Sequence, residues 1–381
     1  MDTTVRTESL NQMIRNKLQA KIEQSQPKAK DALLKLMEEG KISKDFIAPL
    51  GVRLREQQRE QHITFGANGH VLMNLKAQEG LKTFTMHEHA VGQVGEKLSI
   101  PTRYLRDLAT DKEWERQLAS TILNQHSSWT DRQRVLLRTV GEEVRGVLSD
   151  SYKRYNSEEL ITAFLQEVEA NGGVLVDGFL DATRMWFETF YPVPFDIPTE
   201  KNGIVTIAFG ARFGTSDYGD GAVEERAFFI QGACLNGMVR NSLLRQVHLG
   251  ARLPDNLEFS KNTYRLDSRT MASSIKDITR NIFAPEKIRR SIAEIQASSN
   301  IEVDLKKELT NLSKGKLLKD EVKEIEGVFM RNREDDGCVG ESTLWKLTQG
   351  ISAVARTAAP RRQRELQEIA GELLDRTNRV L

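Results

Sequence analysis

Four consecutive residues, Tyr152 to Tyr155, combine two aromatic rings with the cations of Lys153 and Arg154. Single-stranded nucleic acid is bound by such combinations, because bases stack on rings while cations follow the phosphate backbone. The four residues stand directly before an expected helix N-terminus, which favours anions. Further arginines follow on strand-like segments and after them. The predicted nucleic-acid contacts are Tyr152, Lys153, Arg154, Tyr155, Arg184, Arg212, Arg226, Arg240, Arg245 and Arg252.

A purely structural role fits the same residues. The rings would then anchor a core, and the arginines would pair with the carboxylates Glu142, Glu143, Glu224 and Glu225. The chain has 55 Lys and Arg against 54 Asp and Glu, a formal net charge of +1. Any nucleic-acid contact must therefore come from a local patch. Both interpretations stay open from the sequence.

The sequence gives weaker indications of a metal site, a nuclease site or a nucleotide-binding site. His87 and His89 are two residues apart, and such residues do not face each other on a helix. The acidic and lysine residues at 320–323 distantly resemble a nuclease cluster, but they fall in a helical pattern and indicate a solvated helix face. No Gly-x-x-x-x-Gly-Lys phosphate loop and no nucleophile elbow is present. We expect no cofactor, no metal and no enzymatic activity.

The two cysteines, Cys234 and Cys338, are too far apart for a metal-ligand motif, and so few cysteines indicate a reducing compartment. The sequence has no basic-then-apolar leader and no apolar run approaching 18 residues. These features predict a cytoplasmic protein with no membrane contact.

The central residues predict an α+β fold. A hairpin is expected over 134–148, then a helix with Asn156 as its N-cap, then strands over 174–190, 205–213 and 223–235. Sequential strands with short links favour one central antiparallel sheet with a packed helix. Asn236-Gly237 predicts a turn with positive φ at the glycine.

Helical patterns flank this centre. At the N-terminus an apolar stripe from Leu10 to Ile22 is expected to break at Pro27, before a second helix that ends at Gly40. A helical pair over 86–109 is predicted to be a packed hairpin rather than a DNA-reading helix-turn-helix. The expected division is an N-terminal helical extension (1–45), a central α+β domain (46–265) and a C-terminal helical domain (266–381). The apolar stripes at both ends predict a homo-oligomer.

Three segments carry a family resemblance: the helical pair around Lys97–Leu105, the stretch Gly146–Asn156 and the turn Cys234–Val239. They resemble the phage/plasmid-like domain-of-unknown-function family 932 over roughly residues 84–255. The resemblance implies a phage, prophage or plasmid origin and brings no established reaction. A looser similarity, at the level of fold, is to the phage single-strand annealing proteins, which act as rings or filaments without ATP or metal.

The function expected from these observations is binding of single-stranded DNA, with ATP-independent strand annealing in phage or plasmid recombination or replication as its extension. The alternative is a protein-interaction or host-defence-blocking factor that binds no nucleic acid. A metal-dependent nuclease is the least favoured reading.

Overall fold

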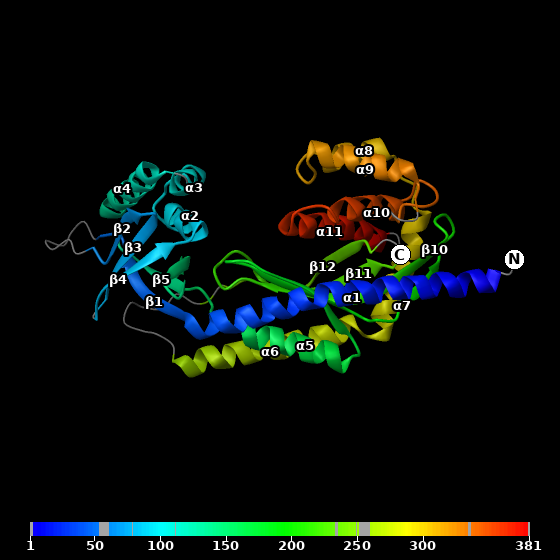
Figure 1. The fold of residues 1–381 in the computed structure, drawn as a ribbon, viewed down its shortest axis with the longest axis horizontal. Helices are drawn as coiled ribbons and strands as arrows, with labels where there is room; N and C mark the ends of the chain where they lie inside the picture. Colours follow the sequence, from blue (N-terminus) through cyan, green and yellow to red (C-terminus); the bar gives the residue numbers. More distant parts are fainter. Residues whose placement is uncertain are drawn as a thin grey trace.

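The chain forms two lobes, each built on its own β-sheet (Figure 1). A computed structural model describes residues 3–52, 61–77, 79–110, 112–232, 235–248, 250, 260–333 and 337–379. Cys234 and Arg252 lie outside the described residues. Helices and antiparallel-rich sheets share the described chain, so the predicted α+β class is confirmed.

The first lobe holds a six-stranded sheet in the order β1-β5-β6-β4-β3-β2. Neighbouring strands are antiparallel except β4 and β6, which pair in parallel over two residues. The predicted 134–148 hairpin is its β5–β6 pair. Its strands are β1 (Ser43–Leu50), β2 (Ile63–Asn68), β3 (His70–Ala77), β4 (Gly80–Met86), β5 (Gln133–Val140) and β6 (Glu143–Ser149). Its helices are α2 (Glu88–Lys97), α3 (Thr102–Thr110) and α4 (Glu113–Trp129).

The second lobe holds a sheet in the order β12-β11-β10-β8-β7, with β9 also paired to β10. Every recorded pairing in it is antiparallel. Its strands are β7 (Val174–Leu180), β8 (Met185–Phe190), β9 (Phe195–Pro198), β10 (Ile204–Thr215), β11 (Val223–Gln231) and β12 (Gly237–Gln246). Its helices are α1 (Thr3–Ile42), α5 (Ser157–Ala170), α6 (Lys261–Ile282), α7 (Pro285–Asn300), α8 (Leu305–Leu312), α9 (Lys319–Arg331), α10 (Leu344–Ala355) and α11 (Pro360–Leu374), followed by a 3-10 turn at Asp375–Arg379.

Helix α1 runs without a break through Pro27, so the predicted interruption there is wrong. Its buried residues Leu18, Ile22, Ala29 and Leu36 follow one another at spacings of four and seven, which places them on one side of the helix. This side packs against the second sheet, with Leu18 and Ile22 beside Val176 of β7. The burial outweighs the cost of about 3 kcal/mol that a proline imposes on a helix interior.

The region after β11 also differs from the expected turn. Positive φ occurs at Leu235 (59°), whereas Gly237 is the first residue of β12 and is not in the left-handed region. Gly237 instead lies at a close contact, from which the end of the Gln367 side chain would have to shift if a Cβ were added. A Cβ at this position would lie 2.6 Å from the Gln367 side-chain nitrogen, because α11 crosses closely over β12.

The predicted three-part division does not follow how the chain packs. The expected boundary at 265/266 falls inside α6, and the predicted single sheet is two sheets. Strand β10 is buried at every residue after Ile204. Because both of its faces need cover, the sheet takes α1 from one end of the chain and helices α5–α11 from later in it.

Glu225 of β11 makes stability dependent on pH. Its carboxyl is fully buried and accepts a hydrogen bond of 2.6 Å from the Thr279 hydroxyl of α6. Burial raises the pKa of Glu225 from 4.5 to about 8. Between these values the folded state keeps a proton that the unfolded chain releases, so stability should fall as pH rises from 4.5 to about 8.

We therefore predict that Glu225→Gln, which cannot ionise, flattens this decline. Melting temperatures of wild type and variant should diverge between pH 5 and pH 8, with the variant the more stable at pH 8. Parallel curves would show that Glu225 is not protonated in the folded protein.

Candidate nucleic-acid interface

The Tyr152–Tyr155 cluster is engaged within the fold. The Tyr152 ring stacks on His248 at 4.8 Å, and its hydroxyl donates to the Ser216 carbonyl at 3.0 Å. Tyr155 is buried. Lys153 pairs with Asp267 at 3.2 Å, and Arg154 pairs with Asp45 at 3.5 Å and lies over the Tyr264 ring. The structural interpretation therefore describes this cluster best, because its rings are not exposed for stacking.

Arg154, Tyr155 and Arg184 line a cleft of about 710 Å³ where the two lobes meet. Both signs of charge occur among the described residues that line it. The cations are Lys44, Arg138, Arg154, Arg184 and Arg265, and the carboxylates are Glu39, Asp45, Glu158, Glu159, Asp181 and Asp217. Carboxylates thus outnumber cations by six to five, and the cleft offers no net attraction to a phosphate chain.

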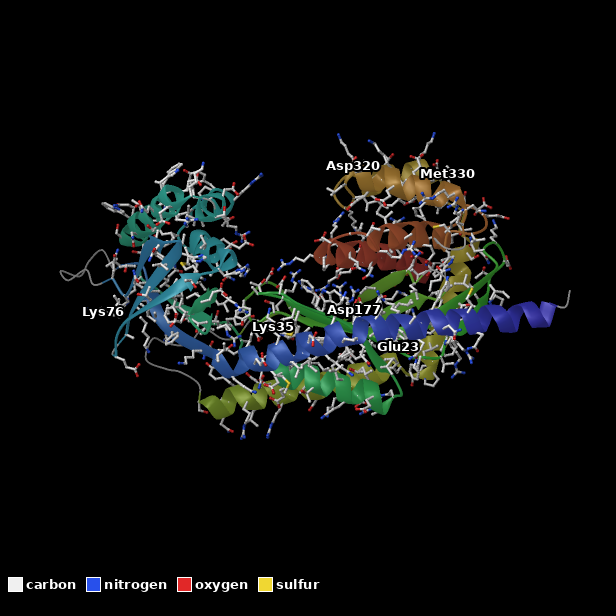
Figure 2. All side chains as sticks on the ribbon, in the orientation of Figure 1. Glu23, Lys35, Lys76, Asp177, Asp320 and Met330 are labelled. Atoms are coloured by element: carbon white, nitrogen blue, oxygen red, sulfur yellow. The ribbon has the colours of Figure 1, made fainter. Side chains whose placement is uncertain are left out.

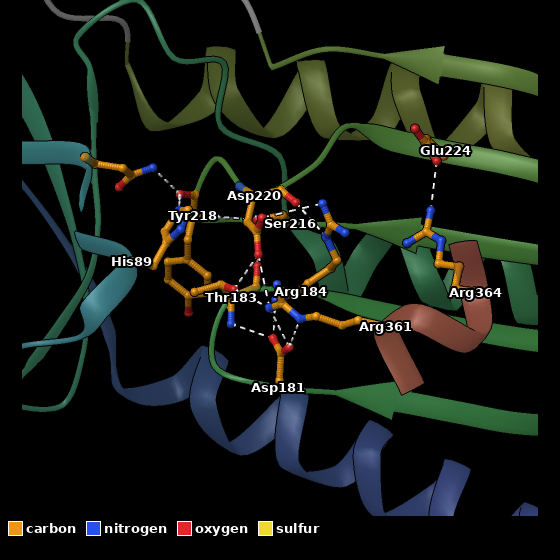
Figure 3. A network of polar contacts seen from close by, with 11 residues as sticks. His89, Asp181, Thr183, Arg184, Ser216, Tyr218, Asp220, Glu224, Arg361 and Arg364 are labelled. Carbon is orange, nitrogen blue, oxygen red and sulfur yellow. Dashed lines mark hydrogen bonds and ion pairs between the residues drawn. The ribbon is translucent and has the colours of Figure 1, made fainter. Parts of the chain in front are cut away.

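A polar network fixes the loop that joins β10 to β11 beside this cleft (Figure 3). The Ser216 hydroxyl donates to the Thr183 carbonyl at 2.6 Å and accepts the backbone N–H groups of Tyr218 and Asp220. The Thr183 hydroxyl and Arg184 donate to Asp220 at 2.7 and 2.6 Å. The loop is thereby held to the β7–β8 turn of the second lobe.

The same loop holds the first lobe. Two side chains of α2, His89 and Gln93, contact the Tyr218 carbonyl at 3.0 and 2.8 Å (Figure 3). A carbonyl only accepts hydrogen bonds, so Nε2 of His89 carries the proton. Burial lowers the pKa of His89 and keeps its ring neutral at physiological pH. Arg361 of α11 joins the network through Asp181 at 2.6 Å. The polar groups of this seam are engaged in holding the lobes together.

Of the remaining predicted arginines, two form buried ion pairs and two share one carboxylate. Arg212 is buried against Glu188 and Gln367, and Arg240 is buried against Glu294 and Asp375. Neither guanidinium can reach a strand on the surface. Arg226 and Arg245 both pair with Glu224, at 3.0 and 3.4 Å.

A second hollow, between α1 and α11, has a different charge balance. This α1–α11 groove measures about 540 Å³ and runs over β8, β11 and the start of β12. Its polar walls come from the two helices, at helical spacings along each. The residues that line it are Lys17, Ala20, Lys21, Gln24, Ser25, Glu188, Phe228, Ile230, Leu235, Gly237, Arg356, Gln363 and Gln367.

The groove is cationic. Among the described residues that line it, Lys17, Lys21 and Arg356 are basic and Glu188 is the single carboxylate. Glu188 is buried in an ion pair with Arg212, whose guanidinium lies behind it. Arg212 keeps two buried nitrogens, Nε and Nη1, without a hydrogen-bond partner. Burial and the charge of Glu188 raise the pKa of nearby Asp177, and Lys21 opposes this shift. Three cations therefore line the groove against one carboxylate that is paired with Arg212.

The sequence analysis missed this site. Lys17, Lys21 and Gln24 recur at i, i+4 and i+7, which is one polar stripe beside the buried stripe of Leu18 and Ile22. The spacing of this stripe is visible in the sequence. The opposite wall of the groove is formed by Gln363 and Gln367 of α11, which lie more than 300 residues away in sequence. Only the fold brings the two helices to one groove.

The acidic cluster at 320–323 lies on α9, as its helical pattern predicted. Asp320 points outward at the rim of the second lobe, with 99% of its side chain exposed, and Met330 marks the same outer helix (Figure 2). Glu321 pairs with Arg362 at 2.7 Å. In the described part of the chain, no three His, Cys, Asp or Glu side chains gather as metal ligands, and none of its helices is long and apolar enough to cross a bilayer.

Comparison with protein-family models, with curated proteins and with solved structures found no match. The resemblance indicated by the short motifs stays a prediction.

The Arg212–Glu188 pair provides a stability prediction. Arg212→Leu leaves the Glu188 carboxylate buried without a partner, which should cost about 3–5 kcal/mol in the free energy of unfolding. Adding Glu188→Leu removes the orphaned charge and should recover most of that loss. Urea denaturation measures both.

Arg245→Leu is the matched control, because Arg245 pairs with Glu224 while its side chain is 62% exposed. Exposed pairs contribute about 1 kcal/mol or less. Equal losses for Arg212→Leu and Arg245→Leu would contradict the role of the buried pair.

Proposed function

We propose that the α1–α11 groove binds single-stranded DNA through its phosphate backbone. The observation that carries this proposal is the charge balance of the groove. Lys17, Lys21 and Arg356 line it, while the one carboxylate described there is neutralised by Arg212. Phosphate contacts of this kind supply most of the affinity of non-specific nucleic-acid binding.

Binding by this groove would be independent of base sequence. Phe228 and Ile230 form a floor that is almost fully buried, so no ring is open for base stacking there. The amides of Gln24 and Gln363 can donate to or accept from the edges of any base. Helices flank the groove on both sides, which favours one strand over a duplex.

The proposed role is binding without a chemical step. It would suit the phage or plasmid DNA metabolism that the sequence resemblance implies. Strand annealing, the extension of this function, would need several grooves aligned along one strand, and therefore an assembly of copies.

Three neutralised phosphates should give a characteristic salt dependence. For single strands the slope of log K against log [salt] is roughly −0.7 per phosphate, so we expect a slope of about −2. Lys17→Glu with Lys21→Glu should weaken binding of all sequences by roughly tenfold or more and bring the slope toward about −0.7. Fluorescence anisotropy of a labelled oligonucleotide measures both.

Lys306→Glu with Lys307→Glu is the matched control. It makes the same change of charge at the exposed start of α8, outside the groove. Equal weakening by the two double variants would show that net charge, and not the groove, controls binding. Wild type that binds no single strand at low salt would refute the proposal.

A second variant changes the charge of the groove without changing the shape of a side chain that lines it. Gln363→Glu adds one negative charge in place of a neutral amide of the same shape. It should weaken oligonucleotide binding severalfold at low salt and much less at high salt, because exposed charges are screened. A salt-independent loss would indicate a direct contact of the amide with the bases instead.

A further inference from the structure

Helix α4 has two apolar faces, although it packs through only one of them. Ala119 and Leu123 are buried in the core of the first lobe. On the opposite side Trp114 is 59% exposed, Leu118 is 36% exposed and Trp129 is 71% exposed. An amphipathic surface helix needs one apolar stripe, so the second stripe has no role in the described fold.

The exposed residues lie together along the helix. From Trp114 to Leu118 is one turn, and Trp129 follows after three further turns on the same side. We refer to Trp114, Leu118 and Trp129 as the Trp stripe. Exposed apolar stripes of this kind mark interaction surfaces, and tryptophan is enriched where binding energy concentrates.

Charges beside the Trp stripe argue against nucleic acid as its ligand. Lys112 pairs with Glu115 at 3.6 Å, and Arg116 pairs with Glu113 at 3.2 Å. These four charges cancel, so no local excess of cations is available for phosphates. Exposed indole faces attract cations and methionine sulfur from a partner.

The first turns of α1 have the matching chemistry. Leu18 is the first buried side chain described on α1, and Met13 before it is 44% exposed. A hollow of about 540 Å³ on this side is lined by α1 residues alone: Gln12, Met13, Asn16, Lys17 and Ala20. Between Ser9 and Lys21 the sequence carries three cations and no carboxylate. We call residues 12–17 the α1 overhang; they lie toward the N-terminal end of α1, on the side of the molecule away from the first lobe (Figure 1).

We propose that the Trp stripe of one copy binds the α1 overhang of a second copy. Helix α4 and the N-terminal end of α1 lie toward opposite ends of the long axis of the molecule (Figure 1). A contact between unlike surfaces at opposite ends is heterologous, and its repetition produces rings or filaments. This assembly does not depend on the proposed DNA binding.

The test uses one variant of each surface in the full chain. Trp114→Ala with Trp129→Ala removes the stripe, and Met13→Glu places a charge in the overhang. Each should raise the dissociation constant of assembly by more than about thirtyfold, so that light scattering reports the 43.2 kDa monomer where wild type is larger. Leu81→Ala and Leu34→Glu are matched controls, because both residues are exposed outside the two surfaces. They should assemble as wild type does.

Mixing the two variants separates this contact from a symmetric one. The intact overhang of the first variant can bind the intact stripe of the second, so the mixture should form dimers that grow no further. A symmetric stripe-to-stripe contact predicts instead that Met13→Glu still dimerises alone, and that outcome overturns the proposal. Circular dichroism shows whether each variant is folded. If the tryptophan variant unfolds, Leu118→Arg is used in its place.

Two other results would also overturn it. One is that both variants assemble as well as wild type does, and the other is that wild type is monomeric at high micromolar concentration. If the tryptophan variant instead loses oligonucleotide binding without any change in mass, the stripe is a nucleic-acid surface. Loss of DNA binding in the Gln363→Glu variant with assembly unchanged would leave this proposal standing, because Gln363 lines the groove and not the overhang.

Discussion

Strand β10 is buried at every residue after Ile204, and this constraint determines the arrangement of the second lobe. A strand buried on both faces needs helices on both sides of its sheet. Helices α5 and α6 cover one face, where they pack against Phe187 and Phe213. The two ends of the chain cover the other face: α1 packs through Leu18 and Ile22, and α11 packs so closely that a Cβ at Gly371 would lie 1.8 Å from the Val239 carbonyl oxygen. Each helix buries one face and keeps a polar one. The α1–α11 groove is the place where those polar faces meet.

The buried guanidinium of Arg212 gives this groove its charge. A buried ion pair is weak evidence for stability, because the cost of removing two charges from water can exceed their attraction. The effect of this ion pair on the charge of the groove follows directly from its position. Glu188 would otherwise place a negative charge in the groove wall, and Arg212 cancels it from behind without occupying the groove. The surface cations of α1 and of the α10–α11 corner then act without opposition from this carboxylate.

Local signals in the sequence predicted the elements that depend on local structure. The α+β class, the helical pair now seen as α2 and α3, the β5–β6 hairpin and the Asn156 cap of α5 all follow from periodicity, turns and capping. The continuous α1 could not be predicted, since the contacts that carry it through Pro27 come from the distant β7. The aromatic and basic cluster at Tyr152–Tyr155 was visible, but its pairing with His248, Asp45 and Asp267 depends on tertiary contacts. The residue types showed which side chains could bind nucleic acid, and their burial in the fold determines which of those side chains are accessible to a ligand.

The two proposed surfaces share part of α1. Lys17 and Ala20 line both the groove and the hollow of the overhang. A strand in the groove and a second copy on the overhang would therefore contact adjoining sides of the same helical turns. By thermodynamic linkage, the factor by which a bound strand changes the affinity of assembly equals the factor by which assembly changes the affinity for the strand. Annealing needs the grooves of several copies on one strand. The shared turn of α1 is therefore the place where strand binding and assembly would be coupled.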